Sequence, residues 1–209
     1  MNPETTSRRE RERETHRLQI MDAAEAIFSA RGYNAVTVED IAEKAGFAVG
    51  SIYNFFGGKQ DLFDQVLLRI AQNRIDDIEQ RILPVEDKWE GLRLMCGLWM
   101  AHHERHQAFL HIAIGAKLSG GIEKLVRNET VHALAIKYHG RELEFFESFA
   151  ALPDVRPFSP EECLHVFDGV ARSLLFHRGA RDLVHHLAAN DTRPLDVVLF
   201  EMLEKIFRK

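Results

Sequence analysis

The sequence contains little of what marks a secreted or membrane-spanning protein. Only two of the 209 residues are cysteines, and Cys96 and Cys163 stand far apart in apolar helical surroundings. This spacing argues against a disulfide framework or a metal knuckle, and favours reduced core residues. No apolar run reaches membrane-spanning length, and no signal-peptide apolar region follows the N-terminus. We therefore expect a cytoplasmic protein that does not associate with a membrane.

Catalytic motifs are also missing. We find no nucleophile–base pair and no cofactor-binding loop, so we expect neither an enzyme nor a bound cofactor. The net charge is −5, which means that the molecule as a whole cannot bind polyanions through bulk charge. Any contact with nucleic acid would need a local basic surface.

What the chain does contain is helical periodicity, with no convincing strand pattern. Hydrophobic residues make up 45% of the sequence, as in ordinary globular proteins. We expect an all-α fold of about nine helices. Their approximate ranges are 15–31, 38–45, 48–55, 59–83, 86–103, 107–117, 122–151, 160–178 and 194–209, with a short extra helix within 180–191.

The most informative stretch runs from Thr37 to Leu62. Its first apolar stripe recurs at helical spacing and consists of Val38, Ile41, Ala42 and Ala45. Thr37 precedes the stripe as the expected N-cap, and Gly46 follows it where a left-handed residue is wanted. Two short helices joined across such a glycine predict a helix-turn-helix, whose second helix enters the major groove of DNA.

This stretch resembles the DNA-binding domain of the tetracycline-repressor (TetR) family of transcription regulators. The matching residues fall in register at fixed spacing: Thr37, Ile41, Ala42, Ala45, Gly46, Phe47, Gly50, Ser51, Ile52, Tyr53, Phe56, Lys59 and Leu62. The resemblance implies an N-terminal arm and three-helix DNA-binding domain over residues 1–62, followed by a helical effector-binding and dimerisation domain over residues 63–209. It also implies a homodimeric repressor that binds a palindromic double-stranded DNA operator and is released by a small, largely apolar effector.

Particular residues are expected at the DNA: Thr37, Val49, Gly50, Ser51, Tyr53, Asn54 and Lys59. Gly50 would let the backbone approach the duplex closely, while Tyr53 and Lys59 would contact phosphates. Asn54 could pair with adenine, and Val49 could meet a thymine methyl.

Two residues depart from the family pattern. Ala48 replaces the serine that would cap the recognition helix, a loss of about 1 kcal/mol. Phe55 replaces a histidine or tyrosine, and its ring cannot donate to a phosphate oxygen. Phe55 either removes a DNA contact in this way or simply packs beneath the recognition helix.

The N-terminal arm carries four arginines that alternate with glutamates over residues 8–14. One interpretation is a solvated, frayed arm. The other is an arm that lays arginines on phosphates or into the minor groove, although the interleaved glutamates weaken it.

Two further sets of residues follow from the resemblance. Large, adaptable side chains in the middle helices could line an effector pocket or form ordinary core: Trp89, Met95, Trp99, His103, Phe109 and Phe149. Apolar stripes of the last two long helices could form a dimer interface or be buried within one protomer: Phe167, Val170, Leu174, Leu199, Leu203 and Ile206.

His102, His103 and His106 lie close together in the sequence. Imidazoles at this spacing could bind a transition metal, but no cysteine or carboxylate completes a recognisable ligand set, so we expect no metal site. The alternative to a regulator is a helical small-molecule or metal carrier with a vestigial helix-turn-helix. Ala48, Phe55 and the net acidity are its best support.

Overall fold

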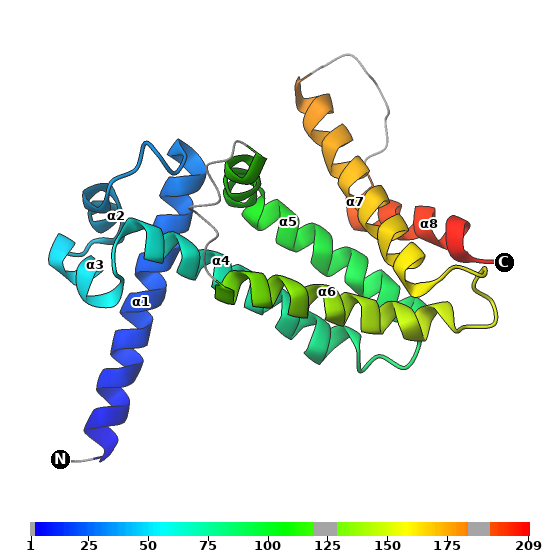
Figure 1. Cartoon of the computed structure of the whole chain (residues 1–209), viewed down its shortest axis with the longest axis horizontal. Coiled ribbons are helices and arrows are strands. Elements are labelled where there is room, and N and C mark those ends of the chain that lie inside the picture. Colours follow the sequence, from blue (N-terminus) through cyan, green and yellow to red (C-terminus); the bar gives the residue numbers. More distant parts are fainter. Residues whose placement is uncertain (1–2, 119–128, 184–192) are drawn as a thin grey trace. The chain divides into compact units, whose positions relative to one another are not determined.

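The computed structural model describes residues 3–118, 129–183 and 193–209. Within these ranges it contains eight α-helices, one π-helical segment and no β-strand, which confirms the all-α prediction (Figure 1). An isolated antiparallel bridge joins Val155 to Arg208. In the described parts of the chain, no helix combines the length and the apolar character needed to cross a membrane.

The chain divides into two compact units. The first comprises residues 1–71 and 106–134, and the second comprises residues 72–105 and 135–209. Three continuous helices contribute residues to both units: α4 (Lys59–Asp77), α5 (Lys88–Leu118) and α6 (Glu129–Ala150). The first unit therefore contains more of the chain than the DNA-binding domain expected over residues 1–62.

The first unit is built from α1 (Pro3–Arg31), α2 (Val38–Ala45), α3 (Val49–Phe55), the start of α4 and the end of α5. Its core consists of Ile20, Met21, Ala24, Phe28, Val36, Val38, Ile41, Ala42, Ile52, Phe56, Leu62, Phe63, Val66, Leu67, Ile70 and Phe109. The expected start of the first helix near residue 15 is wrong, because α1 already begins at Pro3. Arginine and glutamate are good helix formers, and Arg8 pairs with Glu12 one turn later at 3.0 Å.

Both ends of α2 and the start of α3 have the predicted chemistry. The Thr37 hydroxyl accepts from the backbone N–H of Asp40 at 3.1 Å, and the Asp40 carboxylate accepts from the backbone N–H of Thr37 at 2.8 Å. This is a reciprocal capping box. Gly46 adopts the left-handed conformation with φ of 75°, and Ala48 begins α3 without a side-chain cap. All three local predictions are confirmed.

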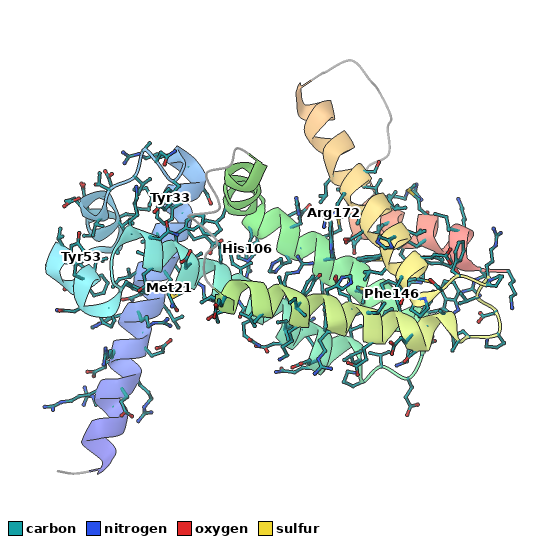
Figure 2. The ribbon with its side chains drawn as sticks, viewed as in Figure 1. Met21, Tyr33, Tyr53, His106, Phe146 and Arg172 are labelled. Carbon is teal, nitrogen blue, oxygen red and sulfur yellow. The ribbon has the colours of Figure 1, made fainter. Side chains whose placement is uncertain are left out.

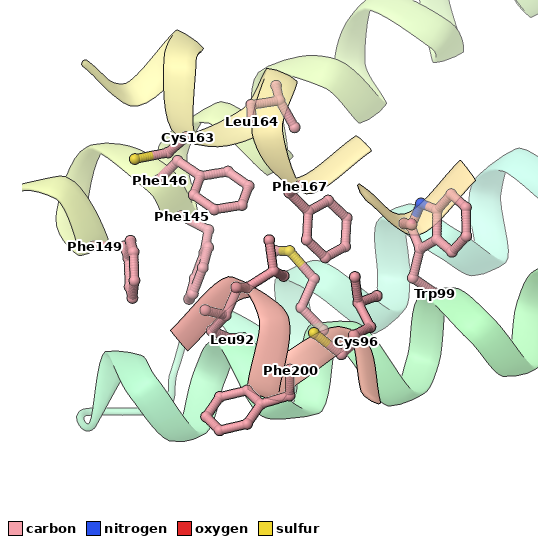
Figure 3. Packing of buried hydrophobic residues seen from close by; sticks show 14 of the residues in the cluster. Leu92, Cys96, Trp99, Phe145, Phe146, Phe149, Cys163, Leu164, Phe167 and Phe200 are labelled. Carbon is pink, nitrogen blue, oxygen red and sulfur yellow. The ribbon is translucent and has the colours of Figure 1, made fainter. Parts of the chain in front are cut away.

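The second unit is made of the end of α4, the π-helical segment η1 (Ile78–Ile82), the start of α5, most of α6, and the helices α7 (Pro160–Leu183) and α8 (Leu195–Phe207). Phenylalanine dominates its core, where the side chains of α6 and α7 meet those of α5 and α8 (Figure 3). Rings of Phe145 and Phe146 pack edge to face at 5.2 Å, and Phe149 packs against Phe207 at 5.5 Å.

Several predicted helix boundaries need correction. The two helices expected over residues 86–103 and 107–117 are the single helix α5. The helix expected to run to residue 83 changes to π-helical geometry at Ile78. The helix expected over 160–178 extends to Leu183. Residues 122–128 and 184–191, where a helix start and most of a short extra helix were expected, lie outside the described residues.

Candidate functional site

The recognition helix α3 has one anchored face and one open face. Ile52 is fully buried, and Phe56, which follows the helix, is 2% exposed. Gly50 and Asn54 are exposed, and Tyr53 keeps 56% of its surface accessible, projecting from α3 (Figure 2). The helix therefore presents a small residue, an amide and a phenol to solvent while its apolar side chains hold it in place.

The remaining expected contacts are less open. Val49 and Ser51 are half-buried at the start of α3. The hydroxyl of Thr37 is used by the capping box, where it also donates to the Asp40 carboxylate at 2.9 Å. The backbone N–H of Thr37, followed by the Arg31 guanidinium, lowers the pKa of Asp40 to about 2. Thr37 thus has a clear structural task whether or not it also touches DNA.

Lys59 points towards the protein backbone rather than straight into solvent. Its ammonium donates to the carbonyl oxygens of Tyr33 at 3.0 Å and Val36 at 2.9 Å, and lies 4.4 Å from the centroid of the Tyr33 ring. These bonds fix the loop between α1 and α2 onto the first turn of α4. Two of the three ammonium donors are therefore already used inside the protein.

A hollow opens in the second unit, with about 300 Å³ of empty volume that includes its mouth. Its lining combines apolar and polar side chains: Arg74, Asp77, Ile78, Ile82, Met95, Leu98, Trp99, His102, Tyr138 and Glu142. Inside its mouth the hollow has room for only about one or two water molecules. A larger ligand would have to widen the hollow by moving the side chains around it.

The polar side of the hollow is a buried cluster of Arg74, Tyr138 and Glu142. The Tyr138 hydroxyl donates to the Glu142 carboxylate and accepts from the Arg74 guanidinium, which lies 4.0 Å from the same carboxylate. Glu142 is only 4% exposed. Burial raises the pKa of Glu142 to about 7, and the hydrogen bond from Tyr138 and the charge of Arg74 oppose this only in part. Burial likewise holds the pKa of Tyr138 well above its usual value.

Sequence reasoning did not identify this cluster. Its available signal was Tyr138 and Glu142, four residues apart and therefore on one face of α6, followed by the buried Phe145 and Phe146. Polar side chains at helical spacing next to an apolar stripe can mark a lined cavity, but they can equally mark the edge of a solvated face.

Of the six residues expected at an effector pocket, Met95 and Trp99 line the hollow. The other four do not line it and have different surroundings. His103 stacks on the Trp99 ring at 5.5 Å, and Trp89 packs against Phe149 at 5.0 Å, with its indole N–H donating to Asp154 at 2.9 Å.

Phe109 belongs to the first unit, where it packs against Phe63 with ring centroids 4.6 Å apart. The assignment of Phe109 to a pocket in the second domain assumed a helix break near residue 106. Because α5 continues through that point, Phe109 reaches the core of the first unit.

His102, His103 and His106 of α5 do not converge. His102 lines the hollow, His103 stacks on Trp99, and His106 pairs its Nδ1 with the carboxylate of Glu25 in the first unit. Burial alone would raise the pKa of Glu25, but His106 and Arg69 together lower it. Among the side chains that the structure describes, no group of three or more histidine, cysteine or acidic residues could hold a metal ion.

The six residues expected at a dimer interface fall into two groups. Phe167, Leu199 and Leu203 are fully buried in the core of the second unit, so in this protomer they offer no surface to a partner. Val170, Leu174 and Ile206 are half-buried and pack at the margin of that core. A partner helix could contact only this second group together with exposed neighbours such as Met202, which is 40% exposed.

The sequence profile of the tetR family of bacterial regulatory proteins matches residues 20–66. That range contains the C-terminal part of α1, the helix-turn-helix and the beginning of α4. The chain contains a DNA-binding domain of the TetR family.

Curated relatives of this chain are transcription regulators, in agreement with the expectation that it is not an enzyme. The HTH-type transcriptional regulator YvdT of Bacillus subtilis is 27% identical over 107 residues, which cover 51% of this chain and 55% of YvdT. The HTH-type transcriptional repressor KstR2 of Mycobacterium tuberculosis is 33% identical over 91 residues, covering 43% of this chain and 44% of KstR2. The chain thus spans about half the length of these relatives.

The fold is similar over nearly the whole chain to that of a TetR family transcription regulator from Marinobacter aquaeolei. The two structures superpose with a TM-score of 0.68 over 96% of this chain and 99% of the other, at 15% sequence identity. At this level of identity the similarity concerns the fold alone.

Proposed function

We propose that the chain is a transcriptional regulator that binds double-stranded DNA through the open face of α3 and acts as a repressor. The observation that carries the proposal is the division of α3 into a buried face at Ile52 and an exposed face at Gly50, Tyr53 and Asn54. A helix held in this way fits the major groove, which is wide enough to admit it. The Tyr53 hydroxyl would donate to a phosphate, and the Asn54 amide would pair with an adenine edge.

The test begins with an operator selected by the wild-type protein from a random duplex library. Asn54→Ala should cost about 1–3 kcal/mol of binding and relax the preference at one base pair. Tyr53→Phe should weaken binding evenly across sequences, because a phosphate contact carries no sequence information. Asn73→Ala, at an exposed position of α4, is the matched control and should bind like wild type. If no sequence is enriched at low salt, the carrier alternative is favoured instead.

The regulator would act as a homodimer. One short recognition helix reads few base pairs, whereas two related by a twofold axis read a palindrome with defined half-site spacing. Support comes from α7 and α8, which keep Val170, Leu174, Met202 and Ile206 partly accessible. Sedimentation velocity should give a dimer for wild type and a monomer for Met202→Glu. Lys205→Glu introduces the same carboxylate at an exposed polar position of α8 and should stay dimeric; a wild-type monomer would contradict this part of the proposal.

The effector would bind in the hollow lined by α4, η1, α5 and α6. Its apolar wall of Ile78, Ile82, Met95, Leu98 and Trp99 fits a small, largely apolar molecule. The cluster around Glu142 would hold a single polar group of that molecule. Since the ligand would contact the last turn of α4, whose first turn belongs to the first unit, it would act on a helix shared by both units.

Native mass spectrometry of the purified protein should reveal a co-purifying small molecule, and its removal should change operator affinity. A coupling of about 1–3 kcal/mol corresponds to about 5- to 150-fold in affinity. Leu98→Trp should fill the hollow and prevent ligand capture, while leaving operator binding and the melting temperature close to wild type. Equal operator affinities with and without a tightly bound ligand would exclude induction by that ligand.

A further inference from the structure

The first half of α1 carries several arginines, and the helical conformation places them on different faces of the helix. A helix advances about 100° per residue, so Arg9, Arg13 and Arg17, spaced four apart, share one face. Arg8 lies on another face and is paired with Glu12 at 3.0 Å. The alternation of arginine and glutamate, which looks neutral along the sequence, therefore becomes a basic stripe of Arg9, Arg13 and Arg17, in which Arg17 forms an ion pair with Glu14 at 3.5 Å.

This basic stripe adjoins the end of α3. The guanidinium carbon of Arg13 lies 5.8 Å from the centroid of the Phe55 ring, and that of Arg17 lies 5.6 Å from the Phe56 ring. Arg17 is also held by Gln65, whose side-chain oxygen accepts from its guanidinium at 2.7 Å. Arg13 is exposed, and among the side chains that the structure describes no carboxylate forms an ion pair with it. Its five donors therefore stand at the end of the recognition helix without an acidic partner.

Phe55 is the last residue of α3, and its ring offers a face but no hydrogen-bond donor. An aromatic face attracts a guanidinium, and a planar guanidinium suits a phosphate group better than any other side chain. We propose that Arg13, positioned over the Phe55 ring, contacts a DNA backbone phosphate beside the recognition helix and supplies the donor that Phe55 lacks. Arg9, one turn further along the stripe, extends the contact to the flanking backbone. This inference rests on the proposed DNA-binding function.

The experiment compares full-length variants on the operator selected by the wild-type protein. Failure of the selection would count against DNA binding as such, whereas the inference about Arg13 is tested only by differences between variants. Arg13→Ala should weaken binding about tenfold and lower the slope of log K against log salt by about 0.9 per protomer, the value for one lost phosphate contact. Arg11→Ala removes the same charge from the opposite face of α1 and should change the slope by less than half as much.

Two further variants separate a positioned contact from bulk charge. Phe55→Leu keeps Arg13 but removes the ring on which it is positioned. This substitution should weaken DNA binding when Arg13 is present and hardly change it when Arg13 has already been replaced by alanine. Phe55→Tyr in that background adds a hydroxyl donor and should recover part of the lost affinity. The circular dichroism spectrum and the melting temperature of Arg13→Ala should equal those of wild type, because Arg13 is exposed. Equal effects of Arg13→Ala and Arg11→Ala, or additive losses with Phe55→Leu, would overturn the proposal.

Discussion

Glu142 makes the stability of this protein depend on pH in a direction opposite to that of an ordinary carboxylate. Burial raises its pKa to about 7 in the folded chain, against an ordinary value of 4.5 that we take for the unfolded chain. The folded state therefore holds the proton more tightly. The stabilisation is fully present below pH 4.5 and is lost as the pH rises through about 7. Since a change of one in pKa corresponds to about 1.4 kcal/mol, the loss is about 3 kcal/mol.

Glu142→Gln isolates this contribution. The amide stays neutral at every pH, and its oxygen can still accept from the Tyr138 hydroxyl. The unfolding free energies of both proteins are measured by urea titration. We expect the value for the variant minus the value for wild type to rise by about 3 kcal/mol between pH 4.5 and pH 8. Taking the difference between the two proteins removes the pH-dependent contributions that they share.

The matched control is Glu144→Gln, which removes an exposed carboxylate from the same helix. Its difference from wild type should change by less than about 0.5 kcal/mol over the same range, as is usual for surface positions. A difference for Glu142→Gln that stays flat between pH 5 and pH 8 would refute the reasoning, because it would mean that the carboxyl of Glu142 is solvated in the folded protein.

Glycine and cap substitutions test other parts of the structure. Gly91→Ala should lower the unfolding free energy in urea by about 1–3 kcal/mol, because the new methyl would lie 2.8 Å from Cε2 of Phe145. Gly97→Ala on the same helix is its control: the nearest neighbour of the new methyl lies at 3.8 Å, so the unfolding free energy should stay unchanged or rise by up to about 1 kcal/mol. Ala48→Ser should raise the melting temperature by adding about 1 kcal/mol, since it supplies the missing cap of α3. Gly50→Ala should fold at least as well as wild type, because nothing lies within 4 Å of the added methyl, yet bind the operator about tenfold more weakly in a gel shift.

The fold was predictable where local chemistry dominates. The capping box at Thr37, the left-handed Gly46 and the buried Ile52 follow from residue type and spacing alone, and they place the helix-turn-helix correctly. The continuity of α5 was not predictable in this way. The polar run from His102 to His106 looks like a junction in sequence, but it contains no helix breaker, and His106 can be buried because Glu25, far away in the chain, pairs with it.

The pocket and the interface were harder to predict for the same reason. Phe109 and Met95 have equally apolar sequence surroundings. It is the packing of α5 against two different cores that places Phe109 in the first unit and Met95 at the hollow. Likewise, Leu199 and Ile206 lie on one apolar stripe of α8, yet Leu199 is fully buried and Ile206 is not. Periodicity indicates which face of a helix is apolar. It does not indicate whether that face meets the same protomer, a partner or a ligand.

Lys59 illustrates how a motif residue can have two tasks. Its position in the family pattern predicts a phosphate contact, and the start of α4 favours an anion there. In the structure its ammonium instead donates to the carbonyl oxygens of Tyr33 and Val36, which closes the loop before the helix-turn-helix. One donor remains for a phosphate, so the two tasks are compatible. Loss of DNA binding in Lys59→Ala would therefore not identify a DNA contact, because the same change loosens the loop that precedes α2. Substitutions on the open face of α3, such as those at Tyr53 and Asn54, separate contact with the duplex from support of the fold.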